Sequence, residues 1–286
     1  MAGAPIFGSM NTPTSSTFGA ARRQPVVFVS PGSPTFPLQS GSAGAALAAF
    51  GRSLTERPRG IVMISPHWIA REARVMTQAA PPTWHDFGGF PEALYRLQYP
   101  APGSPALAAR VGDLLRGAGV ATAPDETRPF DHGAWVPMMH MFPQADVPMV
   151  QLALPAPWTP EGLYAIGKAL APLRDEGILI IASGSMTHNL RAFFGGGRPA
   201  LHAPTERYTS EFARWVEDHL QQGDAAALLD YRRRAPHAAL AHPTDEHFVT
   251  LFIAMGAADA AERPDYLTRE VHFGHFAMDA MAWGPH

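Results

Sequence analysis

Imidazole is the main side chain available for metal or proton chemistry in this chain of 286 residues, which holds 13 histidines and no cysteine. Neutral imidazole binds Zn, Fe, Cu or Ni, and its pKa near neutrality also suits acid/base work. The lack of cysteine excludes disulfides, thiolate metal ligands, iron–sulfur clusters and cysteine nucleophiles. The positions of the histidines therefore decide where a site can lie.

Two histidines follow apolar runs that are typical of strands buried on both faces of a parallel sheet. His67 comes after residues 61–64, and His188 comes after residues 178–183. Because Pro66 cannot donate to a strand ladder, pairing is expected to stop there and leave His67 just past the strand. Ligands of open α/β sheets bind at this carboxyl edge.

Three further histidines stand where they could join the same cleft. His247 lies in the first turn of a predicted helix, and His85 and His132 lie in segments rich in glycine and aromatic residues. Loops of this composition inside compact domains are usually functional. A shared cleft explains the five positions better than five separate structural roles. Spacing alone leaves metal-assisted hydrolysis and oxygenation both open.

The elements that must position these histidines alternate between strand and helix, which predicts a single α/β domain. We expect a largely parallel or mixed central sheet flanked by helices over residues 25–286, after a flexible N-terminal tail at residues 1–24. Predicted strands lie at 26–30, 61–64, 147–154 and 178–183, with an edge strand at 74–78 and a final strand near 271–276. Predicted helices lie at 43–52, from Ser104 onward, 159–173, 205–222, 225–234 and from 244 onward.

Charge and hydropathy limit the classes of partner and the cellular location that we expect for this chain. A formal net charge of −3 gives no reason to expect nucleic acid or an acidic membrane surface. No apolar stretch is long enough to span a bilayer. Arg22 and Arg23 precede a short strand and not the apolar region of an export signal, so a cytoplasmic location is expected. A second copy of the chain is a candidate partner.

Six motifs in a fixed order then make the chain recognisable. The chain closely resembles the DOPA extradiol dioxygenase family of the LigB (class III extradiol) superfamily, from about Val26 to Met278. The motifs are Ile64-Ser-Pro-His-Trp68, Trp84-His-Asp-Phe-Gly-Gly-Phe-Pro91, Tyr99-Pro-Ala-Pro-Gly-Ser-Pro105, Asp131-His-Gly-Ala-Trp-Val-Pro137, Gly184-Ser-Met-Thr-His-Asn-Leu190 and His242-Pro-Thr-Asp-Glu-His-Phe248.

The resemblance implies a LigB-like fold and a non-haem Fe(II) site, with zinc in some members, that opens the ring of a catechol with O₂. His67 and His247 match two of the family's metal ligands, and His188 matches the acid/base residue that takes the catechol proton. His132 is similar to a substrate-side histidine, and His85 and Trp135 lie in motifs on the substrate side. The implied substrate is a DOPA-like or caffeate-like catechol.

One position departs from the family pattern. The family's first metal ligand comes from an H-G-S-P turn, whereas this chain has Pro31-Gly32-Ser33-Pro34. Proline has no donor atom, so one ligand is missing. Three explanations remain open: His188 becomes the third ligand, Glu246 becomes the third ligand, or metal affinity is weak and the protein has diverged to a different reaction or to binding. Glu246 and His247 point about 100° apart on a helix, which disfavours their joint use. A weakened or rebuilt three-histidine site is the interpretation that we favour.

Two other classes of function compete with the dioxygenase. A metal-bound water with His188 as base would make a hydrolase, but the chain has neither an H-E-x-x-H nor a G-x-S-x-G motif. A catalytically inactive member that binds a small aromatic ligand is the second alternative. Its cleft would have little reason to retain four costly polar histidines.

Overall fold

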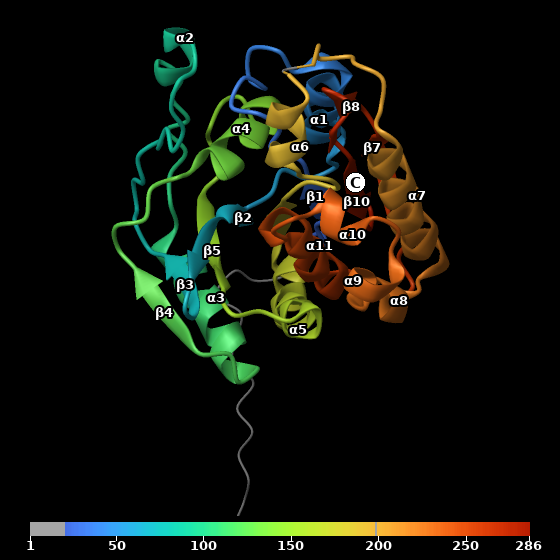
Figure 1. Cartoon of the computed structure of the whole chain (residues 1–286). Coiled ribbons are helices and arrows are strands. Elements are labelled where there is room, and N and C mark those ends of the chain that lie inside the picture. Colours follow the sequence, from blue (N-terminus) through green and yellow to red (C-terminus); the bar gives the residue numbers. More distant parts are fainter. Residues whose placement is uncertain (1–20, 198) are drawn as a thin grey trace, which may run out of the picture.

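The computed structural model describes residues 21–197 and 199–286, and within them one large mixed sheet organises the chain (Figure 1). Eight strands lie in the order β4-β3-β5-β2-β6-β1-β10-β7. Their bounds are β1 Val26–Val29, β2 Gly60–Ala70, β3 Ala73–Met76, β4 Thr122–Asp125, β5 Met149–Pro155, β6 Ile178–Ser183, β7 Asp265–Thr268 and β10 Ala280–Trp283. The central strands β5, β2, β6 and β1 are mutually parallel. The α/β class with a mixed central sheet is therefore confirmed.

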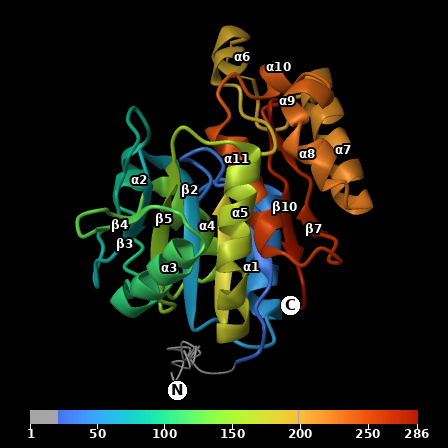
Figure 2. The ribbon, with the colours of Figure 1, turned by 90° about the horizontal axis from the view of Figure 1, so that it is seen from below.

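Helices cover both faces of this sheet. The longer ones are α1 Gly41–Ser53, α3 Pro105–Gly117, α4 His132–Met141, α5 Pro160–Leu170, α7 Arg207–Gln222 and α11 Glu246–Ala257. The shorter ones are α2 Glu92–Tyr95, η1 Ala171–Glu176, α6 Leu190–Gly195, α8 Ala225–Leu229, α9 Tyr231–Arg234 and α10 Ala238–Ala241. At the end of β6, Ser183 donates to the carbonyl of Gly133 on α4, whereas position 184 faces Thr250 on α11. Because neighbouring strand residues point to opposite faces, α4 and α11 cover opposite faces of the sheet. Figure 2 shows α5 alongside α11.

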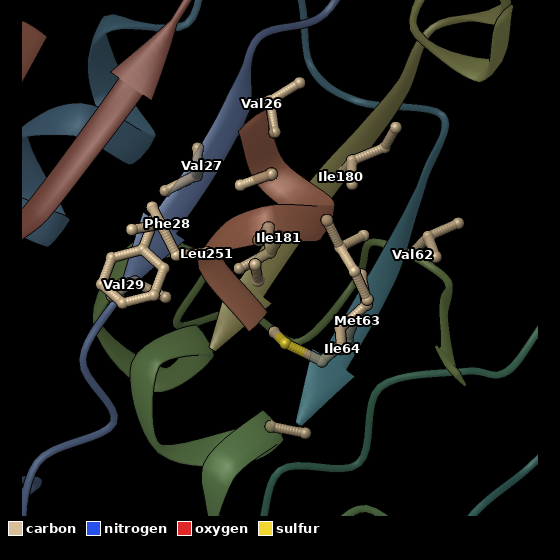
Figure 3. Packing of buried hydrophobic residues seen from close by; sticks show 14 of the residues in the cluster. Val26, Val27, Phe28, Val29, Val62, Met63, Ile64, Ile180, Ile181 and Leu251 are labelled. Atoms are coloured by element: carbon tan, nitrogen blue, oxygen red, sulfur yellow. The ribbon is translucent and has the colours of Figure 1, made fainter. Parts of the chain in front are cut away.

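The core fills the space between the central strands and α11. Figure 3 shows Leu251 of α11 close to side chains of β1 and β6. Residues 26–29, 61–64 and 178–181 have no exposed surface. The unbroken apolar runs in the sequence exist because strands at the centre of such a sheet are covered from both sides.

Strand β2 carries a bulge at the position where His67 stands. Its pairing with β6 ends at Ile64, and its pairing with β5 jumps from Ile64–Leu152 to Ile69–Leu154. The expected interruption at Pro66 is therefore present, but the expectation that the strand ends there is wrong, because pairing resumes at Ile69. Bulges locally redirect side chains, and this one contains Ser65 and His67.

Local helix signals are confirmed where the sequence carries capping residues. Ser104 caps α3 by accepting from the amide of Leu107, with Pro105 at the first helical position. Thr159 caps α5 in the same way. The α5 helix gives way after Leu170 to the 3-10 helix η1, which accounts for the longer helix expected up to residue 173.

Three expectations about the remaining elements are wrong. The predicted helix 225–234 is split into α8 and α9 around Asp230. The strand near residues 74–78 is β3, which lies between β4 and β5 and is therefore not an edge strand. The alternation at 271–276 belongs to a separate small hairpin of β8 (Val271–His272) and β9 (Phe276–Ala277), and β10 follows it into the main sheet.

The predicted tail lies mostly outside the described residues. Among the described part of it, Gln24 is buried and its amide donates to the carbonyl of Arg174. No helix in the described chain is long and apolar enough to cross a membrane.

Candidate functional site

Four of the predicted histidines meet at the carboxyl edge of the central strands. The rings of His67 and His247 lie 5.2 Å apart between centroids at 65°. The ring of His132 stacks on that of His67 at 4.1 Å and 22°, and the ring of His188 stacks on that of His247 at 3.6 Å and 9°. They come from the β2 bulge, the start of α4, the segment after β6 and the start of α11.

The pair of His67 and His247 has the geometry of two ligands of one ion. Their Nε2 atoms lie 3.2 Å apart. Two nitrogens bound at 2.0–2.1 Å to a tetrahedral centre would lie about 3.3 Å apart. Burial lowers the pKa of His247 well below its ordinary value, and the charge of His67 acts in the same direction. His247 is therefore neutral at pH 7, as a metal ligand must be.

The two stacked ring pairs do not have this geometry. Distance alone groups His67 with Asp86 and His132, and His188 with Glu246 and His247, as sets that could hold an ion. The lone pair of an imidazole nitrogen lies in the ring plane, so nearly parallel rings cannot direct their lone pairs at one point. His132 and His188 would have to rotate before either shared an ion with its neighbour.

Carboxylates stand behind both members of the converging pair. Nδ1 of His247 donates to Glu246 at 3.2 Å. Nδ1 of His67 is buried without a hydrogen-bond partner, and it lies 3.7 Å from carboxylate oxygens of both Asp86 and Asp131. Metal-bound histidines usually donate their second ring N–H to such a group. A ring proton on Nδ1 beside these carboxylates would leave Nε2 to an ion. In the absence of an ion, the two Nε2 atoms lie within hydrogen-bond distance of each other.

Asp131 is a fully buried carboxylate with a complete set of donors. Its Oδ1 accepts from Ser65 at 2.6 Å and from the amide of Ala134 at 3.2 Å. Its Oδ2 accepts from Arg128 at 2.5 Å and from Gln151 at 2.8 Å. Burial alone would raise the pKa of Asp131, but its neighbours His67, Arg128 and Ser65 lower it below its ordinary value. The group stays ionised and caps α4 beside the site.

Arg128 connects this carboxylate to the aromatic loop. Its guanidinium lies 5.0 Å from the ring centroid of Trp68 and 5.1 Å from that of Trp84. It also donates to the carbonyl of His67 at 3.1 Å. A guanidinium between two aromatic faces is a stabilising arrangement. Arg128 therefore fixes the backbone of the β2 bulge and the start of the loop together.

His132 is held by Asp86. Both the backbone amide and Nδ1 of His132 donate to Oδ1 of Asp86 at 2.8 Å. Burial lowers the pKa of His132, against the opposing effect of Asp86. The hydrogen bond to Nδ1 assigns the proton of the neutral ring to that atom, so Nε2 is the free acceptor.

His188 is positioned by its backbone and by α11. Its amide donates to the carbonyl of Ala241, and Asn189 caps α6 just after it. A side chain at position 184 would collide with the carbonyl of His247 and the hydroxyl of Thr250. Gly184 thus allows β6 and α11 to approach closely enough for the rings of His188 and His247 to stack.

His85 and Trp135 lie one layer away from the four histidines. The ring of His85 donates through Nε2 to the carbonyl of Leu97 and contacts Phe87, which in turn contacts His132. Trp135 has no exposed surface, and its indole donates to the carbonyl of Trp84. These contacts shape the loop at residues 84–90.

Pro31 stands at the same sheet edge as the histidines. It follows β1, which pairs with β6 up to Val29 and Ser183. Beyond that pair, the hydroxyls of Ser30 and Ser185 lie 3.0 Å apart. The turn after β1 and the segment leading to His188 are therefore neighbours.

Sequence reasoning missed two residues that hold the histidines, Asp86 and Asp131. Both stand directly beside a predicted site histidine in the motifs W-H-D-F-G-G-F-P and D-H-G-A-W. Asp131 could have been identified from sequence, because an aspartate at this position is typical of a helix N-cap. No local pattern indicates that Asp86 contacts His132, 46 residues away.

Comparisons with known proteins identify the family of this chain. Residues 26–280 match the family model described as the catalytic LigB subunit of aromatic ring-opening dioxygenase. A protein of Beta vulgaris named 4,5-DOPA dioxygenase extradiol is 39% identical over 81% of this chain and 85% of its own length. A protein of Escherichia coli K12 with the same name is 38% identical over 91% of this chain and 94% of its own.

A solved structure also has this fold. The crystal structure of an uncharacterized protein from Escherichia coli K12 superposes with a TM-score of 0.76 at 31% identity, covering 92% of this chain and all of that one. With the family model matched over most of its length, the chain belongs to the LigB family of aromatic ring-opening dioxygenases.

Proposed function

We propose that this protein is an extradiol dioxygenase that opens the ring of a DOPA-like or caffeate-like catechol with O₂ and Fe(II). The converging Nε2 atoms of His67 and His247, 3.2 Å apart, are the observation that carries the proposal. The names of the relatives support the reaction class and a catechol substrate. The hydrolase alternative has no such support.

His67 and His247 are the residues that would hold the metal. Fe(II) is the proposed ion and Zn(II) the alternative, because imidazole suits both. When bound, such an ion supplies Lewis acidity toward the catechol oxygens and access to O₂ chemistry. Two protein ligands from one side leave coordination positions open for substrate.

His188 is the proposed proton acceptor for a catechol hydroxyl. Its ring is nearly parallel to that of His247 and cannot direct a lone pair at the ion that His247 would bind. This argues against its recruitment as third ligand and leaves its nitrogens available for the substrate. General acid/base catalysis by a positioned imidazole typically contributes 10²–10⁴-fold in rate.

His132 is proposed to position the aromatic ring through Nε2, since Asp86 occupies its Nδ1. His85 and Trp135 are proposed to affect substrate binding without contacting the substrate. Trp135 is fully buried and His85 is hydrogen bonded to Leu97. Both therefore shape the loop at residues 84–90, which would form one wall of the substrate site.

The third ligand position is the weak point of the centre. Glu246 is engaged with Nδ1 of His247, and so it supports that ligand from behind. Pro31 offers no donor atom where the family pattern has histidine. We therefore propose a two-histidine centre with weakened metal affinity, and not a rebuilt three-histidine one.

Anaerobic reconstitution with Fe(II), followed by oxygen-electrode assays over a small catechol panel, tests this function. We expect about one iron per chain and catechol-dependent oxygen uptake, both lowered in His67→Ala and His247→Ala. His202→Ala, which removes a largely exposed imidazole elsewhere, is the matched control. Full iron occupancy in both His67→Ala and His247→Ala would show that these two histidines do not bind the metal. Release of product from chromogenic esters without oxygen uptake would identify a hydrolase instead.

A further inference from the structure

Asp86 lies between two of the stacked histidines and contacts them with different oxygens. Its Oδ1 accepts from the amide and from Nδ1 of His132, both at 2.8 Å. Its Oδ2 lies 3.7 Å from Nδ1 of His67. The side chain is 9% exposed, so water does not easily replace either partner.

The two carboxylates near His67 differ in their free capacity. Both oxygens of Asp131 already accept two hydrogen bonds from protein groups. Within residues 21–197 and 199–286, no group donates to Oδ2 of Asp86, and Nδ1 of His67 has no acceptor. A shift of less than about 1 Å would bring these two atoms to an ordinary hydrogen-bond distance.

We propose that Asp86 is a positioning residue that holds His67 and His132 together, one on each carboxylate oxygen. The inference rests on the metal centre of the proposed function. An ion on Nε2 of His67 requires the ring proton to be on Nδ1, where Asp86 is the acceptor with a free oxygen. The same carboxylate keeps the proton of His132 on Nδ1 and its Nε2 free for the substrate.

This arrangement links metal binding to the aromatic loop. Asp86 belongs to the segment at residues 84–90, which is anchored by the bond from the amide of Trp84 to the carbonyl of Phe130. When His67 binds an ion, the hydrogen bond from its Nδ1 to Asp86 would hold this loop against the metal centre. The metal centre and the substrate wall are thus joined by one side chain.

Asp86→Asn separates this role from simple structural support. The amide oxygen of asparagine can still accept from His132, but its NH₂ group would then face His67. An NH₂ group only donates, so His67 would need its lone pair on Nδ1 and its proton on Nε2. That tautomer cannot bind an ion through Nε2. We expect Co(II) affinity to fall about 10–100-fold, the usual effect of losing such a partner.

The experiment is an anaerobic Co(II) titration of the full chain, without catechol, that follows affinity and the visible d–d bands. Asp224→Asn, the same substitution at a helix cap, is the matched control. Metal-free melting of both variants checks folding. Asp86→Glu keeps a carboxylate on the loop, and its affinity is expected between wild type and Asp86→Asn.

Weaker binding with unchanged d–d bands at saturation supports the positioning role. Wild-type affinity in Asp86→Asn overturns it. Altered bands at saturation would also overturn it, because Asp86 would then be a ligand itself. If the wild-type protein binds no Co(II), the metal centre of the proposed function fails together with this inference.

Discussion

Nε2 of His67 and Nε2 of His247 approach to 3.2 Å across 180 residues of sequence, and each Nδ1 faces a carboxylate. Without an ion, one neutral ring can donate its Nε2–H to Nε2 of the other at this distance. The carboxylates behind them are the partners that tune histidine ligands in metal sites. The same two rings therefore fit the proposed metal centre if an ion replaces the hydrogen bond between them.

Metal removal is expected to lower thermal stability through this pair. At a free metal concentration 100 times the dissociation constant, binding stabilises the native state by about 2.7 kcal/mol. For a chain of this size that corresponds to a melting temperature about 5 °C higher. Scanning calorimetry with and without a chelator measures the effect. His247→Ala is the control. Its melting temperature should be the same with and without metal.

Pro31→His is expected to strengthen metal binding by supplying a third imidazole. Position 31 follows β1 beside the segment that leads to His188. A third ligand from this edge would raise Co(II) or Fe(II) affinity and catechol-dependent oxygen uptake together. Pro31→Ala removes the proline without adding a donor atom and serves as control. No gain in affinity over Pro31→Ala would show that position 31 does not face the ion.

The central elements could be predicted from sequence because their burial leaves an unbroken apolar pattern. Residues 178–183 form β6 as expected, and the cap at Ser104 starts α3. Strands β4 and β7 were missed, since they lie at the two edges of the sheet and are only partly buried. Apolar periodicity is weak in such strands.

The residues of the candidate site also fall into those that the sequence could place and those that it could not. Histidines at strand ends could be placed at one edge from the order of the elements alone. The hydrogen bond from His132 to Asp86 depends on how a long loop folds back onto α4. No period or cap records such a contact, because it joins two segments through side chains only.

Gly184→Ala is expected to weaken both the fold and the metal centre. The added methyl group would meet the carbonyl of His247 and the hydroxyl of Thr250, so α11 must shift away from β6. Overpacking of this kind typically costs 1–3 kcal/mol. Urea denaturation and Co(II) titration measure the two effects. Gly195→Ala, where a Cβ meets no atom within 4 Å, should show neither loss.

Asp279 is expected to make stability fall as pH rises. Burial raises its pKa from 3.8 to about 7, and the charge of Glu217 acts in the same direction. Between those two values the folded chain keeps a proton that the unfolded chain has released, so the free energy of unfolding decreases with increasing pH and levels off above about pH 7. The difference between the two pKa values corresponds to roughly 4 kcal/mol.

The test of this titration compares wild type with Asp279→Asn in urea denaturation from pH 4 to pH 8. The buried histidines contribute the opposite slope in both proteins, because lowered pKa values favour the folded state as pH rises. Their effect cancels in the difference between the two curves. Asparagine cannot ionise, so its stability relative to wild type should increase from pH 4 to pH 7 and then stay constant. A difference that does not change with pH would mean that Asp279 is ionised in the folded protein throughout this range.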